Sequence, residues 1–279
     1  MNRIYIKGIF FTTLLLLCLF TWVQAQESNN IKLTQPTKKG GLTIMETFSI
    51  RASERSWADR ELSSQDLSNL LWAANGINRS DSKKRTAPSA GNSQDVDIYV
   101  IMKSGVYLYD AANHALNLVS AGDHRSEIGR PMGGPRSSGG APENPGNAPA
   151  DAPGGPSAAQ GGTPSAPPGG GTGARGGMPD RGAGGPAAGN STAAVNLIMV
   201  SDRSKLRMGT EETKKETGII DAALVSENIS LFCAGNGLAN VPRAGSISDK
   251  KDALKTLLKL KDTQYIVIEN AVGYPVETK

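Results

Sequence analysis

The sequence has few of the residues that form disulfides or bind metal ions. Among its 279 residues are only two cysteines and two histidines. Cys18 lies in an apolar N-terminal run, so removal of that run leaves Cys233 alone and excludes a disulfide within the chain or a cysteine metal cluster. Leu231 and Phe232 precede Cys233, which favours a buried thiol on a helix over a reactive nucleophile.

The sequence also has few aromatic residues and only a small excess of positive charge. Aromatic residues make up 5% of the chain, and the formal net charge is +4, of which Arg3 and Lys7 supply two. No basic stripe with interleaved aromatic residues is present, so the sequence gives no case for a nucleic-acid partner. His114 falls in an expected hairpin turn and His124 lies between two charged residues, so we expect both at the surface and not in a metal site.

Residues 1–25 resemble a secretory signal peptide. Arg3 and Lys7 form a positive start, residues 9–23 are almost entirely apolar, and Ala25 ends a stretch suited to cleavage before Gln26. An uncleaved anchor is the alternative, although the apolar run is shorter than the ~20 residues that a membrane span needs. We expect an exported protein, periplasmic or extracellular.

Residues 131–191 differ in composition from the rest of the chain. This segment holds 12 of the 16 prolines and 19 of the 33 glycines, with six charged residues and no aromatic residue. Such a segment cannot bury enough apolar surface to offset the entropy of ordering, which predicts a disordered insert. The flanking blocks, residues 26–130 and 192–279, are together large enough for one domain, and a surface insert costs that domain little.

The hydrophobic pattern predicts helices and strands in both blocks. In the first, Ser63 can cap a helix that ends near Gly76, and residues 97–102, 106–109 and 115–119 predict an antiparallel meander. In the second, residues 195–200 predict a buried central strand, 218–235 and 250–260 predict helices, and 265–268 predict a last strand. For the helix over 218–235 we expect a small-residue face of Ile219, Ala222, Ala223, Ser226, Ile229, Ser230 and Cys233. The fold class is therefore α+β around one sheet.

Three short stretches contain candidate ligand-binding residues. The first, Arg51-Ala52-Ser53-Glu54-Arg55, places two guanidinium groups and a hydroxyl at alternating positions of one segment, which suits a phosphate. The second, residues 85–94, has Pro88 and Ser89 before Gly91 and Asn92, so backbone can approach a flat ligand while an amide meets its polar edge. The third, residues 240–245, is interpreted as a turn that presents backbone N–H groups. Taken alone, the first stretch is better explained as exposed basic residues and the second as a plain turn, while the third could equally be a simple connection.

Together these stretches resemble the nitroreductase family. Arg-x-Ser-x-Arg at residues 51–55 is similar to the family's N-terminal phosphate motif, and Pro-Ser-x-x-Asn-Ser-Gln at residues 88–94 is its most specific signature here. Val241-Pro242 before Gly245 is similar to the turn that faces the flavin N5, and residues 272–275 are similar to the closing strand. Residues 70–76 and 106–110 look closest to the branch of thiazoline- and oxazoline-oxidising enzymes.

The resemblance implies a three-layer α+β sandwich, with a mixed or antiparallel central sheet flanked by helices, in an obligate homodimer that binds FMN in each interface cleft. By this resemblance the cofactor-binding residues fall into three groups and a tail: Arg51, Ser53 and Arg55 at the phosphate and ribityl end; Pro88, Ser89 and Asn92 at the ring; Ala244 and Gly245 at N5; and Lys279 at the phosphate. Two departures stand out. Alanine occupies position 244, where many members have glutamate, and the sequence has no basic segment beyond the closing strand.

The activity implied is FMN-dependent oxidoreduction with ping-pong kinetics, in which an unknown donor reduces the flavin and a small organic substrate is then reduced. The cofactor carries this chemistry, so no catalytic side chain is assigned. Export raises a rival hypothesis, because nicotinamide donors are not expected outside the cytoplasm and the start of the chain lacks the paired arginines of prefolded export. The rival is an exported, non-catalytic nitroreductase-like binding or structural module.

Overall fold

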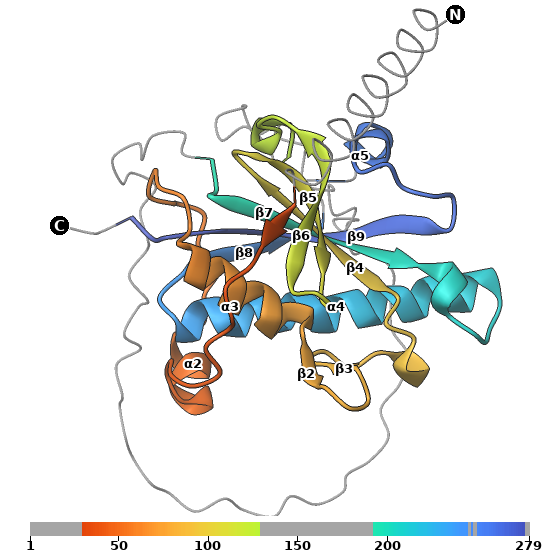
Figure 1. Cartoon of the computed structure of the whole chain (residues 1–279), viewed down its shortest axis with the longest axis horizontal. Coiled ribbons are helices and arrows are strands. Elements are labelled where there is room, and N and C mark those ends of the chain that lie inside the picture. The colour runs from red at the N-terminus through yellow and green to blue at the C-terminus, as the bar shows by residue number, and fades with distance from the viewer. Residues whose placement is uncertain (1–29, 129–191, 245–246, 248–249, 277–279) are drawn as a thin grey trace, which may run out of the picture. The chain divides into compact units, whose positions relative to one another are not determined.

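The central sheet joins strands from both blocks of the sequence. The structure is a computed structural model that describes residues 30–128, 192–244, 247 and 250–276. Within these residues seven strands form one sheet in the order β1-β6-β5-β4-β7-β9-β8, and each neighbouring pair is antiparallel (Figure 1). The strands are β1 Ile31–Lys32, β4 Val96–Met102, β5 Gly105–Asp110, β6 Ala115–Ala121, β7 Val195–Asp202, β8 Ala239–Arg243 and β9 Gln264–Gly273.

The middle of the sheet is the pair β4 and β7, which lie on opposite sides of the Gly/Pro-rich stretch in the sequence. Their register runs from Val96 opposite Ser201 to Met102 opposite Val195. All eight residues of β7 are buried. The continuous apolar run at 195–200 is therefore confirmed as a central strand covered on both faces.

Helices cover both faces of the sheet and make three layers. The α-helices are α2 Ile44–Ile50, α3 Ser64–Asn75, α4 Glu211–Gly235 and α5 Lys251–Leu257, and a small hairpin is formed by β2 Ile77–Arg79 and β3 Lys84–Arg85. In Figure 1 α3 and α4 lie on one side of the sheet and α5 lies on the other. The described residues confirm the predicted α+β sandwich, with an antiparallel sheet.

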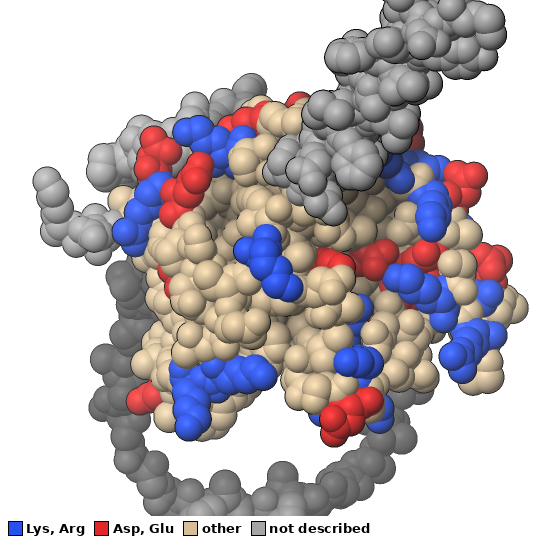
Figure 2. Space-filling view, viewed as in Figure 1, with Lys and Arg blue, Asp and Glu red and all other residues tan. Residues whose placement is uncertain are grey.

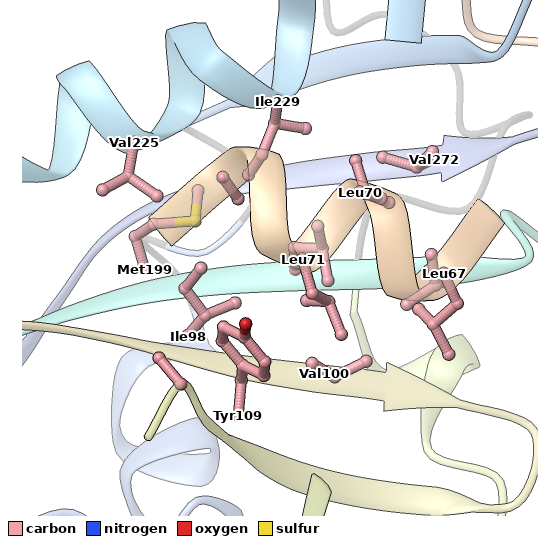
Figure 3. Packing of buried hydrophobic residues seen from close by; sticks show 14 of the residues in the cluster. Leu67, Leu70, Leu71, Ile98, Val100, Tyr109, Met199, Val225, Ile229 and Val272 are labelled. Carbon is pink, nitrogen blue, oxygen red and sulfur yellow. The ribbon is translucent and has the colours of Figure 1, made fainter. Parts of the chain in front are cut away.

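Two hydrophobic clusters hold these layers together. The larger packs Leu70 and Leu71 of α3 and Ile229 of α4 against the sheet (Figure 3). The second packs Leu254 of α5 and the neighbouring Leu258 against the other sheet face. Each such fully buried side chain contributes about 1.5–3 kcal/mol relative to exposure.

Several local predictions are confirmed. α3 has Ser63 as its N-cap, whose hydroxyl accepts the Asp66 N–H, and Gly76 as its C-cap. The meander is β4, β5 and β6 with consecutive pairing. Cys233 is fully buried on α4, and burial raises the pKa of its thiol.

Other predicted bounds are wrong. α4 begins at Glu211, before the predicted start at 218, because Thr210 caps it and accepts the Thr213 N–H. Ile219 and Ala223 are exposed, whereas Asp221 and Val225 lie on the buried face instead. The helix predicted over 250–260 is shorter, and β9 continues past the predicted end at 268 as far as Gly273, because β8 pairs with this part of it.

Some expectations lie outside the described residues. They are the signal peptide at 1–25, the insert at 131–191, and the site residues Gly245 and Lys279. By length and composition α4 is apolar enough to cross a membrane. It packs along the sheet and buries Asp221, Ser226 and Ser230, which is the position of a core helix.

Candidate functional site

The segment carrying Arg51, Ser53 and Arg55 follows α2 and is anchored through its backbone. Arg51 is the C-cap of α2, and residues 51–56 are all exposed. The Glu54 N–H donates to the carbonyl of Asn240 at 2.9 Å. The chain then bridges from Trp57 to Pro275. The first stretch thus lies beside the third and beside the closing tail, with its side chains at the surface.

The third stretch is a strand over most of its length, so its prediction as a turn is wrong. Residues 240–243 belong to β8, which pairs with β9 at the edge of the sheet. Pro242 lacks an N–H donor and is tolerated because it lies on an edge strand. Ala244 follows β8 directly and is exposed. The proline hides the strand pattern in the sequence.

An ion pair fixes the end of β8. Arg243 and Glu269 are directly opposite on β8 and β9, and the guanidinium Nη2 donates to the carboxylate Oε1 at 2.6 Å. The Glu269 side chain is 0% exposed, so its charge needs a partner. This pair was not predicted, although a glutamate inside the apolar run of β9 is a signal that a cation lies nearby.

A buried amide network ties β8 and β9 to α4. The Asn240 Nδ2 donates to the Ser230 Oγ at 3.1 Å, and the Asn270 Nδ2 donates to the Asn240 Oδ1 at 3.2 Å. The Ser226 hydroxyl completes the network by donating to the Asn270 Oδ1 at 2.7 Å. Because buried polar groups that are fully hydrogen-bonded rigidify their surroundings, this network holds β8 beside residues 51–55.

The second stretch forms a tight loop between β3 and β4. Gly91, Asn92 and Gln94 all have left-handed backbone, with φ of 58°, 55° and 49°. Such conformations cost free energy in residues other than glycine and persist where the surroundings fix them. Here the Gln94 N–H donates to the Ser89 Oγ at 3.0 Å, and the Asn92 N–H donates to the Ser89 carbonyl at 2.9 Å. Hydrogen bonds between its own residues therefore fix the conformation of the loop.

The outer side of this loop is open. Pro88, Gly91 and Asn92 are exposed, and Ser89 is half-buried. A side chain at Gly91 would meet no atom within 4 Å. The backbone of the loop is therefore accessible from this side.

Two buried carboxylates hold the loop from inside. The Asp221 Oδ2, on α4, accepts the Ala90 N–H at 2.9 Å. Asp95 accepts the hydroxyls of Ser93 at 2.8 Å and of Ser201 at 2.7 Å. Burial, together with the neighbouring Asp95, raises the pKa of Asp221 to about 6. No pattern in the sequence singles out either aspartate.

Arg85 secures the loop on its other side. Its Nε donates to the Gln94 Oε1 at 3.0 Å, and its Nη1 donates to the Asn75 carbonyl at 3.0 Å. Burial lowers the pKa of this guanidinium. Arg85 therefore acts as a structural clamp between α3 and the loop.

In one chain the two groups of expected cofactor contacts lie apart. The loop at 88–94 contacts α4 at Asp221, whereas a cavity of about 180 Å³ beside residues 50–54 is lined by Cys233 and Ala234 of α4. Cys233 lies twelve positions after Asp221, which corresponds to roughly 18 Å along a helix axis. A single described chain therefore does not bring the phosphate group and the ring group into one cavity.

Apolar side chains are exposed next to these segments. On α2, Met45 is 72% and Phe48 is 54% exposed, and Ile220 and Leu224 form an exposed pair on α4. Between these helices lies an open groove of about 380 Å³ lined by Leu42, Ile44, Trp72, Leu231 and Phe232. In Figure 2 charged side chains of both signs lie at the end of the molecule where α4 begins. Exposed apolar side chains beside an open groove are typical of an interaction site.

The two histidines have structural positions. His124 bonds Glu127 at 2.8 Å near the surface. His114 was expected at the surface, but it is half-buried, with its ring nitrogens 2.8 Å from the Ser68 Oγ and 2.9 Å from the Tyr109 hydroxyl. Burial lowers its pKa. Among the described residues no group of three or more His, Cys, Asp or Glu side chains is placed to hold a metal ion.

Comparisons with known proteins show which proteins this chain resembles in sequence and fold. The model of the Nitroreductase family matches residues 49–150, which include the first two stretches. A putative nitroreductase from Ralstonia eutropha JMP134 is 24% identical with a TM-score of 0.63, over 90% of this chain and 91% of that one. The comparison with curated proteins gives no match.

Two further solved structures have a similar fold at lower sequence identity. A putative nitroreductase from Anabaena variabilis ATCC 29413 is 13% identical with a TM-score of 0.57, over 88% of this chain and 42% of that one. A chain of the E. coli microcin synthetase McbBCD complex with truncated pro-MccB17 bound is 15% identical with a TM-score of 0.52, over 88% of this chain and 78% of that one. The chain therefore has the nitroreductase-like fold.

Proposed function

We propose that this chain is an FMN-dependent oxidoreductase of the nitroreductase family that binds its cofactor in a cleft between two copies. The observation that carries the proposal is the loop at 88–94. It combines a prearranged left-handed backbone with an open outer side, and it occurs in a fold shared with nitroreductases. The match of the family model over residues 49–150 supports the same assignment.

The phosphate end of FMN is assigned to Arg51, Ser53 and Arg55. All three side chains are exposed on one backbone-anchored segment. Within the described residues none of them forms an ion pair, so the two guanidinium groups are available for bidentate contacts with phosphate. Lys279 would add a charge from the tail.

The ring end is assigned to Pro88, Ser89 and Asn92 on one side and to Ala244 and Gly245 on the other. The Ser89 oxygen accepts from Gln94, and its hydroxyl proton is left to donate. The exposed Asn92 amide offers a donor and an acceptor. Alanine at 244 is compatible with this role, since the proposed contact uses backbone N–H groups and Ala244 directly follows Arg243, which is paired with Glu269.

A second copy completes the site in this proposal. The phosphate and ring groups are separated along α4 in one chain, so a two-fold partner must bring its loop at 88–94 to the other's residues 51–55. The exposed apolar surface of α2 and α4 is the contact proposed for that partner. Two-fold homodimers are the commonest assembly, and they use the same patch on both copies.

The bound flavin would supply the redox chemistry, taking electrons from a donor and passing them to a small organic substrate in ping-pong order. The chain's own residues bind and orient the cofactor and exclude water from its ring. No side chain is assigned to proton transfer. Membership of the thiazoline- and oxazoline-oxidase-like branch is part of the proposal and is supported by the likeness of the fold to the McbBCD chain.

Export to the periplasm or the cell exterior remains a proposal from residues 1–25, and it favours one rival. A chain exported unfolded meets flavin only afterwards, so an exported nitroreductase-like module without turnover is the second candidate. Retention of flavin separates the two, because a module without turnover has no need of it.

The test is the visible absorption spectrum of the purified chain with FMN added, before and after gel filtration. Flavin bands near ~450 nm that stay with the protein support an FMN site. The double variant Arg51→Ala/Arg55→Ala should lose this flavin, whereas Lys103→Ala/Arg207→Ala, with the same loss of exposed positive charge, should keep it. Equal retention by both variants removes the proposed phosphate site.

A further inference from the structure

A cavity of about 360 Å³ lies where β9 begins, apart from the proposed flavin site. None of its lining residues belongs to the stretches at 51–55, 88–94 or 240–245. It is formed by three elements, and its principal lining residues are Lys215 and Ile219 of α4, Lys251 and Lys255 of α5, and Tyr265 and Ile266 of β9.

The cavity exists because the sheet is incomplete at this end. β8 pairs only with Glu269–Gly273, so in the described chain residues 264–268 of β9 have a strand partner, β7, on one side only. The register between β7 and β9 also shifts here, and Val267 is the extra residue of a bulge. Bulges occur at sheet edges and re-aim side chains. α4 and α5 lie on opposite sides of this free edge (Figure 1), which leaves a hollow between them.

The walls of the cavity are apolar. Ile266 belongs to the core cluster beneath α5 and forms the floor with Val267 and Leu260. Ile219 lies on α4 one turn after Lys215 and is exposed toward this space. The Tyr265 hydroxyl is held by the Lys215 carbonyl at 2.7 Å, so its position is fixed.

The rim of the cavity has an excess of positive charge. Asp252 is the one carboxylate in its lining, against three lysines. Lys255 pairs with Asp262 at 2.9 Å outside the cavity. Among the described residues Lys215 and Lys251 take part in no ion pair, so two ammonium groups remain for a ligand.

We propose that this cavity binds a small organic anion, a carboxylate or sulfonate with an apolar ring or chain. The apolar body lies on Ile219, Ile266 and Val267, and the charge lies between Lys215 and Lys251. The volume is at the lower end of the range of about 300–1,000 Å³ that is usual for small-molecule sites, which sets the ligand at the size of one or two rings. This inference is independent of the proposed flavin chemistry.

The test is a fluorescence titration of the full chain with the anionic probe 8-anilinonaphthalene-1-sulfonate and with neutral N-phenyl-1-naphthylamine. The wild-type chain should bind the anionic probe at one saturable site. In Lys215→Gln/Lys251→Gln the Kd for the anionic probe should rise at least about ten-fold, as expected for the loss of two charge-assisted contacts, while the Kd for the neutral probe changes little. Ile219→Trp should fill the cavity and weaken both probes.

Matched variants decide whether the site is the one proposed. Lys259→Gln/Lys261→Gln removes the same charge from the turn after α5, outside the cavity, and should bind the anionic probe as the wild type does. Arg51→Ala/Arg55→Ala should also bind it normally. The inference is overturned by any of three results: no saturable binding, an unchanged Kd in the Lys215/Lys251 variant, or an equal loss in either matched variant. Circular dichroism of each variant excludes binding to unfolded chain.

Discussion

The Asp221 carboxylate on α4 accepts the backbone N–H of Ala90, 131 residues earlier in the chain, at 2.9 Å. This bond links the helix that packs along the sheet to the middle of the loop at 88–94. Asp95 holds the same loop through the Ser93 hydroxyl at 2.8 Å. Two neighbouring buried carboxylates therefore determine where the loop lies, and the raised pKa of Asp221 makes that support sensitive to pH.

Replacing Asp221 with asparagine should change how stability depends on pH. The pKa of Asp221 is raised from 3.8 to about 6 in the folded chain, so between these values the folded state holds a proton that the unfolded state releases. The unfolding free energy of the wild type then falls as pH rises from about 4 to about 6, by at most roughly 3 kcal/mol from this group. An amide at this position keeps an oxygen for the Ala90 N–H and does not ionise, so Asp221→Asn should gain stability relative to the wild type over this range.

The measurement is urea unfolding of both proteins at pH 4.5, 6 and 7.5. Groups with other shifts, such as His114 and Asp110, are present in both proteins and cancel in the difference. Asp123→Asn is the control, because the pKa of exposed Asp123 is lowered, chiefly by its hydrogen bond with Arg125, and its removal gives no relative gain as pH rises. Parallel pH profiles for the wild type and Asp221→Asn would show that Asp221 holds no extra proton.

Local signals in the sequence were enough to predict α3 and the meander. Ser63 caps α3 by a bond to a residue three positions on, and the turn at Lys103-Ser104 lies between its own strands. Such features depend on neighbours in the sequence, and tertiary packing agrees with them. The loop at 88–94 was likewise found from its own residues.

Features set by long-range contacts were not predictable in the same way. β8 is a strand because β9 lies beside it, and the proline within it hides the pattern. The early start of α4 depends on Thr210, while its polar first turns carry no apolar periodicity. Asp221 can be buried because the Ala90 N–H and Asp95 are its hydrogen-bond partners. Both partners are distant in the sequence, so the residues near Asp221 do not predict its burial.

Breaking the Arg243–Glu269 pair should destabilise the fold strongly. Arg243→Ala removes the 2.6 Å ion-pair partner of the fully buried Glu269 carboxylate, and removing one partner of a buried ion pair costs about 3–5 kcal/mol. Lys255→Ala breaks the exposed pair with Asp262 and should change the unfolding free energy far less, because solvent screens an exposed ion pair. Urea unfolding at pH 7 measures both. A loss in Arg243→Ala as small as that in Lys255→Ala would mean that Glu269 is satisfied without Arg243.

The proposed dimer can be tested on α2 without disturbing the core. Phe48 is 54% exposed in one chain, so Phe48→Asp should leave the fold of that chain intact and place a charge in the apolar contact. Sedimentation velocity should show a dimer for the wild type and a monomer for Phe48→Asp. The monomer should retain no flavin, because residues 51–55 and 88–94 of one chain lie beside different parts of α4. Met208→Asp is the control, since Met208 is 86% exposed and lies away from α2. A monomeric wild type that still holds FMN would refute the shared cleft, and a dimeric Phe48→Asp would move the contact to another surface.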